Sequence, residues 1–164
     1  MMKGKVLITQ GVRLFALRVG QLLGDQFDVF FGTADEIPSV LLQQERYLKL
    51  PSHTHAAFEH ELLRICLDNA IDTVIPLGES EIALLGSAVP LFAEYGISIW
   101  APHGSRLGAL TLLRDPDRRF TPVVVDRGRV VAGNMQSPEF AHTLSGVFAQ
   151  VEAANEMALC CVVD

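Results

Sequence analysis

Two carboxylates follow a short apolar strand near the middle of the chain. Thr73–Ile75 is predicted to be a buried strand that stops at Pro76, and Gly78-Glu79-Ser80-Glu81 then opens a helix. Ligands of open parallel sheets bind outside the carboxyl ends of the strands, so Glu79 and Glu81 could bind an amine or a hydroxyl there. Acidic residues in the first turn of a helix are also stabilised by the helix macrodipole alone. Their spacing of two does not place them together as an acid–base pair.

A second candidate lies in the loop between the first predicted strand and its helix, Thr9-Gln10-Gly11-Val12-Arg13. A phosphate could meet the helix N-terminus at such a loop. However, the loop has one glycine, Gly11, where a dinucleotide-binding fingerprint has three. An ordinary tight turn is therefore the simpler interpretation, although Arg13 could still face an anion.

The third candidate is His103, which follows the predicted strand Ile97–Trp100 on the same edge of the sheet as Glu79. Gly104 beside it would let a ligand approach, although most loop histidines are simply solvated. The other histidines do not suggest a metal site, because only His55 and Glu59 share a helix face. We predict no metal and no cofactor.

Composition limits the classes of partner. The chain has 164 residues, a net charge of −6 and 49% apolar residues, which is typical of a folded domain with a sizeable core. Lysine and arginine are scattered, which argues against a nucleic-acid partner. No apolar run is long enough to cross a membrane. The three cysteines, Cys66, Cys160 and Cys161, form no disulfide framework, so we expect a cytoplasmic protein.

Alternating strands and helices must position these candidates. The predicted strands are Lys5–Thr9, Phe27–Phe31, Tyr47–Leu50 (a brief extended piece), Thr73–Ile75 and Ile97–Trp100. The predicted helices are Val12–Leu23, Ala56–Asn69, Glu79–Leu85, a short one from Pro90 to Gly96, and Ser105–Leu113. This pattern indicates an α/β protein with a Rossmann-like, doubly wound, mostly parallel sheet. Lys5–Thr9 and Thr73–Ile75 are expected at its centre, because both are fully apolar.

The pattern changes after Arg114, so we expect residues 1–114 to form the Rossmann-like domain and residues 115–164 an appendage. Thr121–Val125 and Arg129–Ala132 predict a β-hairpin around Asp126-Arg127-Gly128, and Leu159–Val163 predicts a last strand. Between them a helix is expected from Ser137 and Pro138. Its apolar stripe is Phe140, Leu144, Val147, Val151 and Ala154. That stripe must be buried against this chain or a second copy, so a homodimer is possible.

Several short motifs occur in an order found in one family of domains. They are Val6-Leu7-Ile8-Thr9 with Gly11, Tyr47-Leu48-Lys49-Leu50-Pro51 before a helix, Ile71-Asp72-Thr73-Val74-Ile75-Pro76 with Glu79 and Glu81, Tyr95-Gly96-Ile97, and Arg114-Asp115. Because of these motifs and their order, the run from Lys5 to Leu113 resembles the preATP-grasp domain. This is the Rossmann-like first domain of ATP-grasp carboxylate–amine ligases and of carbamoyl phosphate synthase and biotin carboxylase relatives. The resemblance covers about two thirds of the chain.

The resemblance implies binding rather than ligase chemistry in this chain alone. In that family the following domains build the ATP site with a glycine-rich loop, a lysine and metal-binding carboxylates. Here no lysine follows Lys49, and Thr121–Asp164 is too short for such a domain. Family first domains contribute strand-end loops to the substrate site. The corresponding positions here are Gly11, Glu79, Glu81 and His103.

Three hypotheses follow. The first is a non-catalytic module that binds a small ligand or a partner, such as the separate ATP-grasp protein of a split ligase. The second is an independent Rossmann-like protein that binds a metabolite or a nucleotide. The third is an enzyme that uses Glu79, Glu81 or His103, which ranks last because no nucleophile or metal converges with them.

Overall fold

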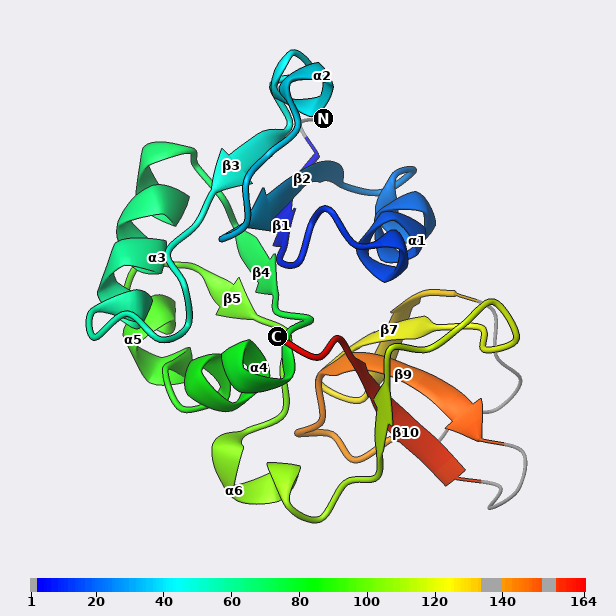
Figure 1. Cartoon of the computed structure of the whole chain (residues 1–164). Coiled ribbons are helices and arrows are strands. Elements are labelled where there is room, and N and C mark those ends of the chain that lie inside the picture. The colour runs from blue at the N-terminus through cyan, green and yellow to red at the C-terminus, as the bar shows by residue number, and fades with distance from the viewer. Residues whose placement is uncertain (1–2, 134–139, 152–155) are drawn as a thin grey trace.

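The computed structural model describes residues 3–133, 140–151 and 156–164 (Figure 1). Its strands are β1 (Lys5–Ile8), β2 (Asp28–Thr33), β3 (Tyr47–Lys49), β4 (Thr73–Ile75), β5 (Ser98–Ile99), β6 (Leu112–Arg114), β7 (Val123–Asp126), β8 (Arg129–Ala132), β9 (Gly146–Val151) and β10 (Glu156–Cys161). Its helices are α1 (Leu14–Leu23), α2 (Ser39–Leu42), α3 (Phe58–Asp68), α4 (Glu79–Gly86), α5 (Val89–Ala93) and α6 (Gly104–Leu107).

The first sheet is parallel throughout and has the order β3-β2-β1-β4-β5. Its two innermost pairs join β1 to β2 and to β4, so the predicted central strands are confirmed. The chain has the Rossmann-like α/β fold that the sequence indicates. An apolar run such as β1, which is buried along three of its four residues, requires cover on both faces of the sheet.

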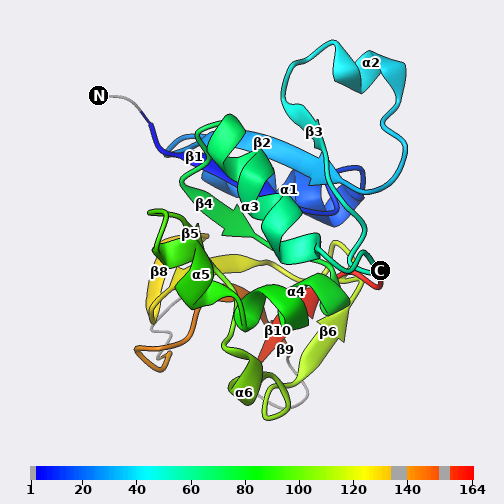
Figure 2. The same ribbon diagram turned by 90° about the vertical axis from the view of Figure 1, so that its left-hand side faces the viewer.

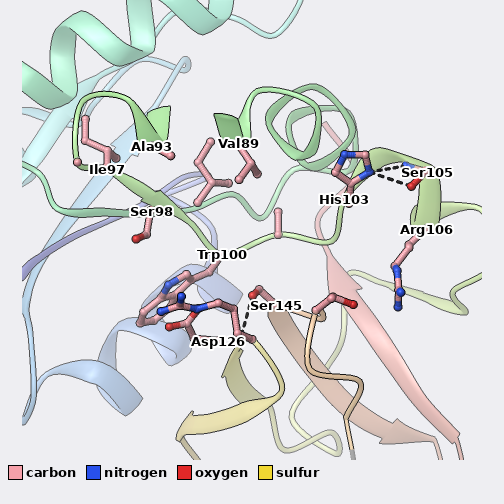
Figure 3. Close-up of a pocket in the computed structure, with 15 residues that line it drawn as sticks. Val89, Ala93, Ile97, Ser98, Trp100, His103, Ser105, Arg106, Asp126 and Ser145 are labelled. Carbon is pink, nitrogen blue, oxygen red and sulfur yellow. Dashed lines mark hydrogen bonds and ion pairs between the residues drawn. The ribbon is translucent and has the colours of Figure 1, made fainter. Parts of the chain in front are cut away.

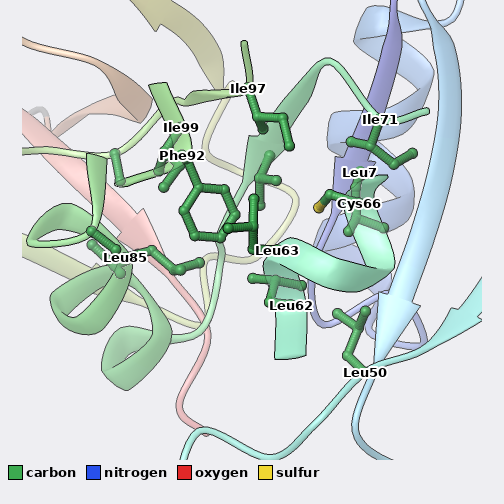
Figure 4. Packing of buried hydrophobic residues seen from close by; sticks show 14 of the residues in the cluster. Leu7, Leu50, Leu62, Leu63, Cys66, Ile71, Leu85, Phe92, Ile97 and Ile99 are labelled. Atoms are coloured by element: carbon green, nitrogen blue, oxygen red, sulfur yellow. The ribbon is translucent and has the colours of Figure 1, made fainter. Parts of the chain in front are cut away.

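Helices provide that cover, and side chains of β1 alternate between the two sides. Val6 and Ile8 pack in a cluster with the buried residues of α1. Leu7 packs in the opposite cluster, which contains residues of α3, α4 and α5 (Figure 4). Figure 2 views the molecule from the side on which these helices lie. Phe58 of α3 and Phe92 of α5 are among the largest fully buried side chains of that cluster.

The second sheet has the order β6-β10-β9-β7-β8 and is mixed. Only β6 and β10 are parallel, and the predicted β7–β8 hairpin is confirmed. Its residues alternate between the same two clusters: Val124 and Cys160 pack on the α1 side, and Val123 and Leu159 pack on the other. A bridge from Gly78 to Val162 connects the two sheets at the end of β4. The second sheet therefore shares its core with the first.

The predicted helix from Ser137 through Ala154 is wrong where the structure describes it. Residues Gly146–Val151 form β9, which lies between β7 and β10, and its first four residues are buried. A strand buried on both faces is apolar at nearly every position, so it also satisfies helical spacing. Ser137, Pro138 and Ala154 lie outside the described residues.

The apolar stripe assigned to that helix packs within this chain. Val147 is buried, and Phe140 and Leu144 pack half-buried against the α3–α5 cluster. The homodimer proposed from this stripe stays a prediction.

The predicted helix Ser105–Leu113 is also too long. Helix α6 ends at Leu107, and Leu112–Arg114 forms β6. Residues Leu112 and Leu113 belong to a strand and not to the helix because they pair with the distant strand β10. Among the residues that the structure describes, no helix is both long and apolar enough to cross a membrane.

Candidate functional site

Glu81 lies at the ends of β1 and β4, where the sequence places it, but the residue is only 3% exposed. Its Oε1 atom accepts hydrogen bonds from Thr9 Oγ1 at 2.9 Å, Gln10 Nε2 at 2.9 Å and the Gly78 N–H at 3.1 Å. Burial raises the pKa of the Glu81 carboxyl, against these hydrogen bonds, which lower it. Gln10 has a φ of 56°, a left-handed conformation that is uncommon outside glycine. Glu81 therefore ties the β1 loop to the β4 loop.

Segment 162–164 fills the space beside these loops. The Val162 N–H donates to the Leu77 carbonyl at 2.7 Å, and the Val162 carbonyl accepts from the Glu79 N–H at 2.9 Å. The Asp164 carboxylate accepts from the Ser80 N–H at 3.0 Å and the Glu81 N–H at 3.2 Å. Its side chain is 5% exposed. The chain thus caps the N-terminus of α4 with its own carboxylate.

Asp164 also adds negative charge beside Glu81. A Cβ atom added to Gly78 would lie 2.3 Å from Asp164 Oδ2 and also 2.3 Å from Glu81 Oε1. These two carboxylate oxygens are therefore at most twice that distance apart. The Asp164 carboxylate contributes to the raised pKa of Glu81. The His53 ring is close to this carboxylate, with Nδ1 3.6 Å from Asp164 Oδ2.

Glu79 binds an arginine of the second sheet. Arg114 Nε donates to Glu79 Oε2 and Arg114 Nη2 donates to Glu79 Oε1, both at 2.8 Å. This bidentate pair lowers the pKa of Glu79, mainly through the hydrogen bond from Arg114. Glu79 and Glu81 therefore both lie at the start of α4 after β4, as predicted, yet each is engaged by a different part of the protein itself.

Gly11 packs against β2 within a tight turn. Its N–H donates to the Gly32 carbonyl at 2.9 Å, and a Cβ at Gly11 would lie 2.6 Å from Phe31 Cβ. Close approach of the backbone to β2 thus requires glycine here, whatever binds at the loop. Arg13 is exposed, and its Nη2 donates to the Val163 carbonyl at 3.5 Å. It lines a cavity of about 350 Å³ with Asp115, Pro116 and Val162.

His103 lines a larger cavity of about 610 Å³, which we call the β5 cavity (Figure 3). One wall is the edge strand β5 and its neighbours from Gly96 to Ala101, and another is Val89 and Ala93 of α5. Opposite them lies the β7–β8 turn, which carries Asp126 and Arg127. The backbone N–H of Arg127 donates to the hydroxyl of the buried Ser145 at 2.9 Å.

The His103 ring caps the short helix α6. Its Nδ1 atom accepts from the Ser105 N–H at 3.2 Å and lies 2.8 Å from Ser105 Oγ. A histidine that acts as a base on a serine needs a third group to orient its other ring nitrogen. Within the described residues no hydrogen bond to that nitrogen is formed, and the bond that is formed, from the Ser105 N–H to Nδ1, is that of a helix cap.

The structure therefore separates the predicted residues into two places. Glu79 and Glu81 lie with segment 162–164, and Arg13 lies beside the same segment at the smaller cavity. His103 lies at the β5 cavity. Sequence reasoning missed Arg106, Asp126 and Arg127 of the β5 cavity. The Asp-Arg-Gly turn was a usable signal for the last two, but its position opposite β5 depends on how the sheets pack.

The cysteines offer no reactive thiol. Burial raises the pKa of Cys66 and of Cys160 to about 12, and that of Cys161 to about 11. Such thiols stay protonated near neutral pH and are poor nucleophiles.

Comparison with models of known protein families gives no match. No curated protein matches the sequence either. The resemblance to preATP-grasp domains therefore stays a prediction from the motifs.

Proposed function

We propose that this chain is a ligand-binding module of the preATP-grasp type, with its small-molecule site in the β5 cavity. The observation that carries this proposal is the cavity itself. Its volume of about 610 Å³ lies in the range of small-molecule sites, and mainly apolar walls hold a few polar groups, as such sites do.

The competing site lies at the carboxyl ends of β1 and β4, among the loops that carry Gly11, Glu79 and Glu81, and we call it the strand-end crevice. The motif resemblance favours it, and Gly11, Glu79, Glu81 and Arg13 stay candidates there. However, segment 162–164 already satisfies the N–H groups of α4, and Arg114 already binds Glu79. A ligand at this place would have to displace both, which is why the β5 cavity is the better candidate.

A matched pair of variants tests the site. Ala93 is exposed and lines the β5 cavity, whereas Ala83 is exposed on α4 and does not line it. Ala93→Trp should narrow the cavity, and Ala83→Trp should leave it unchanged. Thermal unfolding would be followed with a panel of amino acids, carboxylic acids and nucleotides. We expect at least one compound to raise the melting temperature of the parent and of Ala83→Trp, but not of Ala93→Trp.

Two outcomes would contradict the proposed site. Either no compound stabilises the parent protein, or a stabilising compound acts equally on Ala93→Trp. A compound whose effect is lost in Glu79→Gln and kept in Ala93→Trp would assign the ligand to the strand-end crevice instead.

We further propose that the module works with a separate ATP-grasp protein as part of a split carboxylate–amine ligase. The support is the order of the motifs from Val6 to Asp115, which resembles that of the first domain of such ligases. Co-expression with a free ATP-grasp protein of the same genome should yield a complex on size exclusion. Failure of every such protein to bind, with the module correctly folded, would favour an independent binding protein.

A further inference from the structure

The β5 cavity offers main-chain hydrogen bonds, because β5 is the edge strand of its sheet. The Ser98 N–H donates to the Asp72 carbonyl and the Trp100 N–H to the Val74 carbonyl, both at 2.9 Å. Successive residues of a strand direct their N–H and C=O groups to opposite sides. The N–H and C=O of Ile99 therefore point away from β4, toward the side of the cavity that Ile99 lines.

A donor and an acceptor on one residue match the N–H and C=O of another amino-acid residue, and not a single trans amide, whose N–H and C=O point to opposite sides. In a sheet, two residues that face each other in this way exchange both hydrogen bonds. An N-acyl amino acid can supply the same pair of bonds from one side, because its amide N–H can donate to the Ile99 carbonyl while one carboxylate oxygen accepts from the Ile99 N–H. Ile97 and Val89 beside it provide apolar surface for the rest of such a ligand.

The charges of the cavity favour a single negative charge. Two arginines, Arg106 and Arg127, and one carboxylate, Asp126, line it. Arg127 Nε lies 3.6 Å from Asp126 Oδ1, so these two charges compensate each other. Arg106 forms no ion pair with any residue in the part of the chain that the structure describes. One carboxylate would balance it, whereas a polyphosphate would add repulsion against Asp126.

We propose that the β5 cavity binds a small monocarboxylate that carries an amide on the neighbouring carbon, with the amide N–H and one carboxylate oxygen on the Ile99 backbone and the carboxylate also on Arg106. The proposal rests on the proposed function and narrows its ligand class. N-acyl amino acids are the simplest compounds of this class, and N-acetylleucine is a suitable probe because its side chain is apolar.

Amide NMR on the labelled protein gives a direct reading at Ile99. N-acetylleucine should shift the Ile99 amide signal in a saturable way. Arg106→Gln should weaken this binding about tenfold, as expected when a charge-assisted hydrogen bond is lost. The control Arg118→Gln, at an exposed position outside the cavity, should leave binding unchanged. Dispersed spectra of both variants would show that they are folded.

Matched ligands separate the two parts of the proposal. N-acetylleucine amide keeps the amide edge and lacks the charge, whereas 4-methylpentanoate keeps the charge and lacks the amide. Both should bind more weakly than N-acetylleucine, and adenosine monophosphate, the phosphate probe, should bind no more tightly. Equal binding of the neutral amide, tighter binding of the nucleotide, or an unmoved Ile99 signal would each overturn the inference.

These failures differ from failure of the proposed function. If a compound of the metabolite panel binds in an Ala93-dependent manner while N-acetylleucine does not shift Ile99, the ligand class is wrong and the site stands. If neither compound set binds, both proposals are wrong.

Discussion

Glu81 is the residue whose replacement tests the structure most sharply. Its Oε1 atom accepts from three donors, Thr9 Oγ1, Gln10 Nε2 and the Gly78 N–H. Glu81→Ala leaves all three without this acceptor in a buried place. At about 1 kcal/mol for each lost hydrogen bond, the free energy of unfolding should fall by about 3 kcal/mol. Glu81→Gln keeps an oxygen that can accept from the same donors, so it should fall by less than about 1 kcal/mol.

The stabilities of the parent protein and of Glu81→Gln should also depend differently on pH. The pKa of Glu81 is raised in the folded state, chiefly by burial, from an ordinary value of 4.5. The folded state therefore holds this proton more tightly than the unfolded state does. The stability that Glu81 contributes is present at low pH. It is lost as the pH rises from the ordinary pKa of 4.5 through the raised pKa of the folded state. Glu81→Gln cannot titrate, so its stability relative to the parent should increase over the same range.

Urea unfolding of the parent, Glu81→Gln and Glu81→Ala at several pH values would measure both effects. The reasoning is refuted if Glu81→Ala loses less than about 1 kcal/mol, or if Glu81→Gln is as unstable as Glu81→Ala. It is also refuted if the difference between the parent and Glu81→Gln does not change with pH.

Three other predictions follow from the same region and from the core. Asp164→Ala should lower the free energy of unfolding by about 1 kcal/mol, as for loss of a helix cap, and Asp164→Asn by less; thermal melts showing no loss in Asp164→Ala would contradict the cap. Cys66 and Cys160, with pKa values of about 12, should resist iodoacetamide in the folded protein and react in urea; rapid labelling of the native protein, read by mass spectrometry, would show that they are accessible. The chain alone should not bind Mg–ATP tightly, because Gly11 packs on β2 and Asp164 occupies the α4 N-terminus; micromolar affinity by calorimetry would disprove this.

The sequence by itself determined the first sheet. β1 and β4 are short apolar runs bounded by turn residues, and this pattern is visible in a window of a few residues. Their burial on both faces follows from composition alone, which is why their central position could be predicted. The β7–β8 hairpin was equally local, because Asp126-Arg127-Gly128 specifies the turn between its strands.

Tertiary structure decided the rest, because the interactions concerned join residues far apart in the chain. Gly146–Val151 has helical spacing, and only its pairing with β7 and β10 makes it a strand. Glu81 and Asp164 meet because a bridge places Val162 beside Gly78. The β5 cavity exists because the β7–β8 turn packs opposite an edge strand. Local patterns specify which segments are strands and helices, but which distant segments pair depends on the burial of the whole chain.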